Sequence, residues 1–255
     1  MTTWWPYARL AAAMLCGAAI VTQLARTVQN AMETGGHLPT VVANFFSFFT
    51  IESNILAAVA LSVGAIWAWT GNRGEREPQW LAALLICAST YMIVTGIVYN
   101  LLLRGIELPQ GSTVPWSNEV LHVVIPLIML ADVLFAPHRR ALPWNAMLIT
   151  VAFPIVWAAY TLIRGELITA PATGEPWWYP YPFLDPHIQG GYLGVALYVV
   201  GIAVAIIGVA ALVIRVGRRR GLRMVTSVSD GGSSSRSSAP GSRSEQRERH
   251  DRNAI

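Results

Sequence analysis

The strongest constraint on the fold is a series of six apolar windows, each long enough to cross a lipid bilayer. A transmembrane helix needs about 20 mainly apolar residues to span the roughly 30 Å hydrocarbon core. Such windows cover residues 8–28, 45–69, 80–103, 118–136, 143–163 and 191–216, separated by loops with glycine or proline. Only 13% of the residues are charged, against about 25% in a soluble domain. We predict an all-α polytopic membrane protein in which residues 1–216 form a six-transmembrane-helix bundle.

The first window could be mistaken for a signal peptide, because Arg9 precedes an apolar stretch. That stretch, however, ends at Arg26-Thr27 and lacks a cleavage site with small residues. We predict that it is retained as the first transmembrane helix.

The distribution of arginine predicts the orientation in the membrane. Arginines cluster in the second loop, in the fourth loop and after the last window: Arg73, Arg76, Arg139, Arg140, Arg218, Arg219 and Arg220. The odd-numbered loops carry only single arginines at helix ends. Because short loops rich in positive charge stay in the cytoplasm, we predict a multi-pass cell-membrane protein with both termini cytoplasmic.

The C-terminal segment, residues 217–255, holds nine of the 18 basic residues and is otherwise rich in serine and glycine. It has too few apolar residues to offset the entropy lost on folding. We predict a disordered cytoplasmic tail. Its charge favours contact with anionic lipid and does not by itself indicate a nucleic-acid partner.

Neither a metal site nor a bound cofactor is predicted. The sequence has no glycine-rich phosphate loop and no cluster of histidine and cysteine. Cys16 and Cys87 lie singly inside apolar windows, as small core residues do.

Polar residues inside the windows gather at one depth. Thr50 lies about 7 Å below the predicted outer end of its helix, and His122 lies about 6 Å below the outer end of another, at roughly 1.5 Å per residue. Polar side chains within a membrane usually face the interior of the bundle. The sequence therefore predicts a small polar pocket near the outer membrane face.

Each of these residues also has a structural interpretation. An intramembrane threonine often bonds a carbonyl of its own helix, and a histidine can simply bridge two helices. Two acids are predicted to form ion pairs: Glu52 with an outer arginine (Arg26, Arg104 or Arg164), and Asp132 with Arg139 and Arg140.

Three segments carry a family resemblance: SFFTI at residues 47–51, PWSNEVLHVVIP at 115–126, and YPFLD at 181–185. Together they resemble the androgen-induced membrane hydrolases of eukaryotes, the AIG-like family. They are more similar still to a group of uncharacterised bacterial six-span proteins. The likeness extends over about residues 5–216.

The resemblance implies a threonine hydrolase. In the eukaryotic members, a threonine and a histidine on different helices hydrolyse fatty acid esters of hydroxy fatty acids. The matching positions are Thr50, as nucleophile, and His122, as general base. The family pattern has a second histidine where this chain has Glu119.

Four residues are predicted to support the dyad. Asn54, Tyr99 and Asn118 are candidate donors to an oxyanion, and Glu119 is a candidate for orienting His122. The predicted partners are the lipid bilayer and an acyl-ester lipid substrate. The alternative is a non-catalytic membrane protein, either a small-solute binder or transporter, or an assembly factor that uses its basic tail.

Overall fold

The computed structural model describes residues 4–70, 75–106 and 113–233, and in these ranges the regular structure is entirely helical. Six helical segments are long and apolar enough to cross a membrane, which confirms the predicted all-α, six-span architecture. The elements are α1 (Trp5–Thr34), α2 (Leu38–Phe46), α3 (Phe49–Trp69), α4 (Gln79–Val98), η1 (Tyr99–Leu103), α5 (Pro115–Glu119), η2 (Val120–Val124), α6 (Ile125–Phe135), α7 (Ala146–Gly165), η3 (Pro182–Leu184) and α8 (Tyr192–Ser233).

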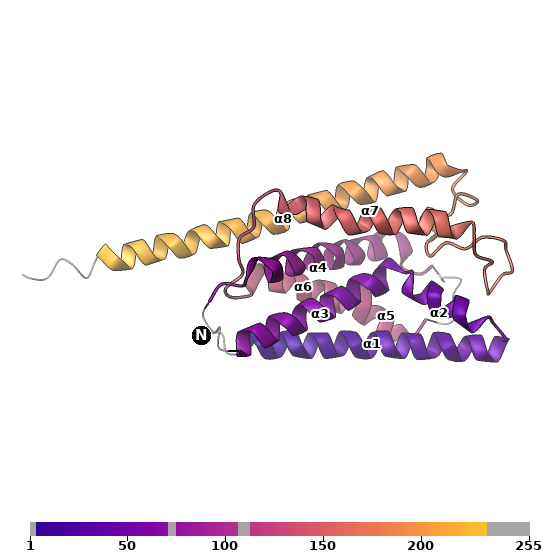
Figure 1. Cartoon of the computed structure of the whole chain (residues 1–255), viewed down its shortest axis with the longest axis horizontal. Coiled ribbons are helices and arrows are strands. Elements are labelled where there is room, and N and C mark those ends of the chain that lie inside the picture. The colour runs from indigo at the N-terminus through magenta and orange to yellow at the C-terminus, as the bar shows by residue number, and fades with distance from the viewer. Residues whose placement is uncertain (1–3, 71–74, 107–112, 234–255) are drawn as a thin grey trace, which may run out of the picture.

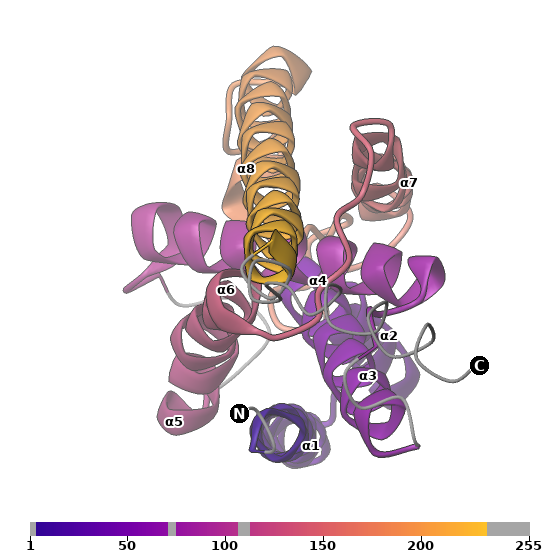
Figure 2. The same cartoon turned by 90° about the vertical axis from the view of Figure 1, so that its left-hand side faces the viewer.

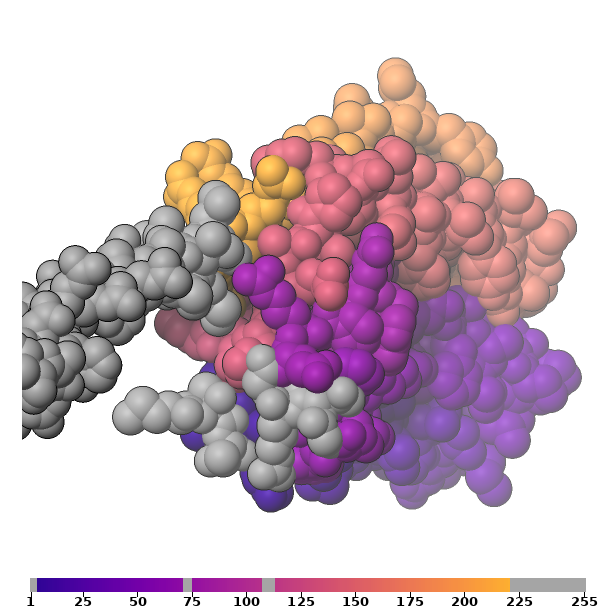
Figure 3. All heavy atoms as spheres, turned by 60° about the vertical axis from the view of Figure 1, so that its left-hand side comes forward, coloured from indigo at the N-terminus to yellow at the C-terminus, as the bar shows by residue number. Residues whose placement is uncertain are grey.

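The bundle is organised around α4, which packs against α3, α6, α7 and α8. Helix α1 packs along α3, on the side of the bundle opposite α8 (Figures 1 and 2). Figure 3 shows the same order on the surface, with α7 and α8 in pink to orange above the indigo N-terminal helices. We call the end at which α1 begins the N end, and the opposite end the far end.

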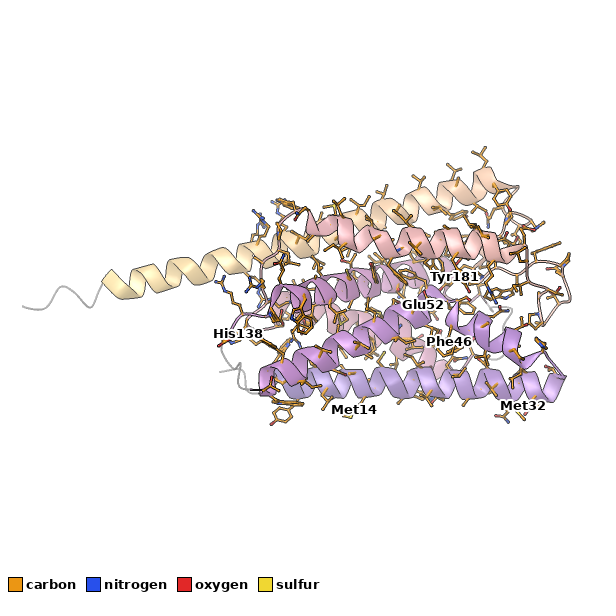
Figure 4. The ribbon with its side chains drawn as sticks, viewed as in Figure 1. Met14, Met32, Phe46, Glu52, His138 and Tyr181 are labelled. Atoms are coloured by element: carbon orange, nitrogen blue, oxygen red, sulfur yellow. The ribbon has the colours of Figure 1, made fainter. Side chains whose placement is uncertain are left out.

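The outer surface of the helices is apolar, as a lipid-facing surface must be. Met14 and Met32 on α1 point away from the bundle in Figure 4 and are 62% and 71% exposed. The peripheral helices α7 and α8 likewise expose many aliphatic side chains, whereas α4 is the most buried span.

The second predicted window, residues 45–69, contains two helices. Helix α2 ends at Phe46, Phe48 adopts an extended backbone (φ −72°, ψ 126°), and α3 begins at Phe49. The break is stabilised from outside, because Trp157 Nε1 donates a hydrogen bond to the carbonyl of Ser47 (3.0 Å). Thr50 is therefore the second residue of a helix, and the prediction that it lies several residues below a helix start is wrong.

The fourth span is also irregular, since a π-helical turn, η2, separates α5 from α6. The N–H of Ile125 bonds the carbonyl of Val120, five residues back, and Pro126 has no N–H to donate. The carbonyl of Leu121 is thus left without its usual partner inside the helix. Asn54 Nδ2 on α3 donates to it instead (3.2 Å), which ties the two spans together.

The last helix is longer than the predicted span, because the backbone of α8 continues to Ser233. Residues 217–226 contain no proline, and arginine, leucine and methionine favour a helix. The rest of the predicted tail, residues 234–255, lies outside the described residues.

A buried ion-pair network closes the N end. Arg9 donates to Asp132 from Nε (2.7 Å) and to Glu77 from Nη2 (2.9 Å), and all three residues are at most 6% exposed. Arg139 contacts Asp132 (3.6 Å), as predicted, but Arg140 bonds the carbonyl of Glu77. The predicted ion pair between Arg140 and Asp132 is thus wrong, because Arg9 on α1 occupies that place beside the carboxylate.

We predict that Arg9→Met lowers the free energy of unfolding by about 3–5 kcal/mol, because it leaves two buried carboxylates without their shared cation. Denaturation of the purified protein in detergent would measure the change. Arg76→Met is the matched control, since Arg76 is exposed in the same region. Equal stability of the two variants would contradict a stabilising role for the network.

Candidate functional site

The candidate site lies towards the far end, where α3 begins and η2 faces it. The hydroxyl of Thr50 is 3.2 Å from Nε2 of His122, and both side chains are buried. The break after α2 positions the threonine, and the π-helical turn carries the histidine. The two residues that sequence analysis placed at one depth are therefore in hydrogen-bond contact.

The hydrogen bonds of His122 determine its tautomer. Its Nδ1 is 2.9 Å from the carbonyl of Asn118, one turn earlier. Because a carbonyl oxygen can only accept, Nδ1 carries the proton of the neutral ring, and the lone pair of Nε2 faces Thr50. The imidazole is thus held in the form that can accept the threonine proton.

Tyr99 fixes the plane of the imidazole. The two rings stack with centroids 4.0 Å apart and an interplanar angle of 26°. The phenol of Tyr99 in turn accepts a hydrogen bond from the side-chain amide of Asn118. Tyr99 and Asn118, two of the predicted oxyanion donors, both contact His122 and are already bonded to each other.

Asn54, the third predicted donor, is fully buried and links two helices. Its Nδ2 donates to the carbonyl of Thr50 (2.8 Å) and to that of Leu121 (3.2 Å). Both amide hydrogens are therefore used within the protein. The side chain thus ties the start of α3, which carries Thr50, to the turn that carries His122.

Glu119 lies one residue before η2 and forms an ion pair with Arg104 (3.1 Å). Glu119 was a candidate for orienting His122, but Nδ1 of that ring is bonded to the carbonyl of Asn118. Arg104 is consequently engaged away from Glu52, whose Oε2 is buried without a hydrogen-bond partner. Of the three arginines predicted as possible partners of Glu52 (Arg26, Arg104 or Arg164), Arg104 pairs with Glu119 instead.

Tyr181 is the site residue that sequence reasoning missed. Its phenol oxygen is 3.2 Å from the hydroxyl of Thr50 and accepts the backbone N–H of Thr50 at the same distance. Figure 4 shows it towards the far end of the bundle. Burial raises the pKa of the phenol to about 12, so it keeps its proton at neutral pH.

An aromatic cage holds Tyr181 in place. Its ring stacks on Phe183 (centroids 5.1 Å apart, 5° between planes) and meets Phe48 edge-on (5.5 Å). The long loop between α7 and α8 thereby folds back into the bundle over the break before α3. The sequence singled out the YPFLD segment for its family resemblance, but that pattern did not indicate a role for Tyr181 itself.

Two cavities meet at Thr50. The first, which we call the apolar cavity, has a volume of about 260 Å³ and lies among α3, α4, α7 and α8. The second, the polar cavity, has a volume of about 380 Å³ and is bounded by α1, α2, η1 and the α5–η2 segment. Thr50, Tyr99, Leu103 and Tyr181 line both of them. His122 lines only the polar cavity.

The site has no metal-ligand character in the part of the chain that the structure describes, where no three His, Cys, Asp or Glu side chains are grouped to hold an ion. Comparisons of the chain with protein-family models, with curated protein sequences and with solved structures found no match.

Proposed function

We propose that the protein is an intramembrane threonine hydrolase of lipid esters. The observation that carries this proposal is the buried contact of 3.2 Å between the Thr50 hydroxyl and an imidazole whose tautomer is fixed for accepting a proton. The likeness of the SFFTI, PWSNEVLHVVIP and YPFLD segments to the AIG-like hydrolases supports the same assignment, because it matches the same two residues. The two cavities at Thr50 give an ester room on both sides of its carbonyl.

The reaction has two halves. Thr50 Oγ1 attacks the ester carbonyl while Nε2 of His122 takes its proton, and collapse of the tetrahedral intermediate breaks the bond to the alcohol, which leaves with that proton. Water then adds to the acyl-threonine and gives a proton to His122. The threonine leaves with this proton, and the carboxylic acid is released.

The negative oxygen of each tetrahedral intermediate needs hydrogen-bond donors. We assign this role to the phenol of Tyr181 and to the backbone N–H of Thr50, which points out of the first turn of α3. The phenol oxygen now accepts that N–H, at the position a carbonyl oxygen bonded to Thr50 would take. A small shift of the phenol would turn it into a donor to the substrate oxygen.

For orientation, we propose that the N end is cytoplasmic and that the site lies near the outer face. The arginines of the second and fourth loops and of α8 support this assignment by the positive-inside rule. Both ends of the described chain lie towards the N end of the bundle (Figure 1).

We predict that a fluorophosphonate probe labels the wild-type protein and that Thr50→Ala abolishes the labelling and ester turnover. Thr50→Ser should retain labelling, because it keeps the hydroxyl. Thr90→Ala is the control, since Thr90 is a fully buried threonine of α4 that lines neither cavity. A folded wild-type protein that neither labels nor hydrolyses esters would favour a non-catalytic binding role.

We predict that Tyr181→Phe lowers kcat about 10²–10³-fold, the usual cost of losing one oxyanion donor, with little change in KM. Steady-state kinetics and a thermal melt would be measured together. Tyr198→Phe makes the same chemical change at a half-exposed position of α8 and should leave kcat unaltered. If Tyr181→Phe lowers only thermal stability, its hydroxyl has a packing role.

We predict opposite accessibilities for cysteines introduced at Thr173 and at Arg76. In intact cells, an impermeant maleimide should label Thr173→Cys, in the loop between α7 and α8, whereas Arg76→Cys should react only after permeabilisation. The native cysteines are buried and give a low background. The reverse pattern would overturn the orientation.

A further inference from the structure

The apolar cavity opens towards the lipid between α7 and α8. Ile155 on α7 and Ile207 on α8 both line it, and both are largely exposed on the outer surface of the bundle (65% and 44%). Its other walls are almost wholly aliphatic or aromatic. A chain in the bilayer can therefore reach Thr50 through this side without contact with water.

The polar cavity has a different character and a different exit. Gln23, Thr27 and Asn118 contribute amide and hydroxyl groups to its wall. Its mouth is at the far end, beside Ile106 (48% exposed) and Thr113. A group in this cavity can form several hydrogen bonds and can leave towards the aqueous phase.

Charge narrows the class of group that fits the polar cavity. Among its described lining residues there is no Asp, Glu or Arg; the titratable side chains there are His122, Tyr99 and Tyr181. Arg104, which follows η1 near this mouth, is already paired with Glu119. An ionised carboxylate in the cavity would lack a cation, and burying an unpaired charge is costly.

We infer that the substrate is an ester of one long acyl chain with a neutral polyhydroxy alcohol, of the monoacylglycerol type. The acyl chain occupies the apolar cavity between α7 and α8, and the alcohol occupies the polar cavity. This inference rests on the proposed hydrolase function and adds the assignment of the acyl chain and of the alcohol to separate cavities.

The arrangement accounts for the fate of each product. The alcohol takes its proton from His122, on the wall of the polar cavity, and leaves by the far-end mouth. Water enters by the same route and reaches the acyl-threonine from the side of the base. The fatty acid then returns to the bilayer between α7 and α8.

The test compares four esters with the purified full-length protein in lipid nanodiscs. Three share one long acyl chain: a monoacylglycerol, a wax ester of a long-chain alcohol, and an ester of a hydroxy fatty acid with a free carboxylate. The fourth is 4-nitrophenyl acetate, which needs neither cavity. We expect kcat/KM for the monoacylglycerol to exceed both other long-chain esters by about tenfold or more, because buried polar groups left unpaired are penalised.

Substitutions in the two cavities test the binding of the acyl chain and of the alcohol separately. Ala203→Trp, which fills the apolar cavity from α8, should raise KM for the monoacylglycerol about tenfold or more, and should raise it more than KM for 4-nitrophenyl acetate. Val204→Trp, on the neighbouring exposed position outside the cavity, is the control. Thr27→Val in the polar cavity should slow the monoacylglycerol and not the wax ester.

The outcomes distinguish the inference from the function beneath it. If no ester, including 4-nitrophenyl acetate, is hydrolysed in a Thr50-dependent way, the proposed hydrolase function fails. If 4-nitrophenyl acetate is hydrolysed but the wax ester or the carboxylate-bearing ester is preferred, the function stands and the neutral-alcohol assignment is overturned.

Discussion

In a bilayer, every backbone N–H and C=O must find a partner within the protein, and the site depends on how this requirement is met at two irregular points. Helix α2 stops at Phe46, and the side chain of Trp157 donates a hydrogen bond to the carbonyl of Ser47, at the break between α2 and α3. The π-helical turn leaves the carbonyl of Leu121 free, and Asn54 bonds it. Thr50 follows the first irregularity, and His122 lies within the second. Both residues thus occupy positions that an unbroken α-helix would not provide.

The same helices support opposite kinds of polar chemistry at their two ends. At the N end, Arg9 forms ion pairs with two buried carboxylates, those of Glu77 and Asp132. Towards the far end, the polar groups at Thr50 are neutral, and several of them face open cavities. Because the buried ion pairs lie at the N end, the cavities at Thr50 are not occupied by charged side chains of the described residues. Helix α1, which carries Arg9, packs along α3, which carries Thr50, so one helix pair connects the two regions.

The six spans could be predicted because hydropathy reports directly on membrane insertion. Counting residues along those spans placed Thr50 and His122 at one level, and the two are in contact, but the count put Thr50 below the start of its helix, whereas it is the second residue of α3. The break at Phe48 escaped prediction because no glycine or proline marks it; Trp157, over 100 residues away, stabilises it. Pro126 lies in the irregular fourth span, but a proline does not indicate which side chain will bond the freed carbonyl of Leu121. Tyr181 and Arg9 escaped for a related reason. Their roles arise from tertiary contacts between distant segments, which a single sequence does not encode in any local pattern.

The group that orients the His122 ring is part of the main chain. Many hydrolases orient their histidine with a carboxylate, and a single substitution can remove that carboxylate. Here the carbonyl of Asn118 accepts a hydrogen bond from the Nδ1–H of His122. Every amino acid at position 118 would supply the same carbonyl. A substitution at position 118 would therefore remove the amide that bonds Tyr99, but not the carbonyl that bonds the ring. Such an anchor is robust to mutation and is lost only if the helix itself is distorted.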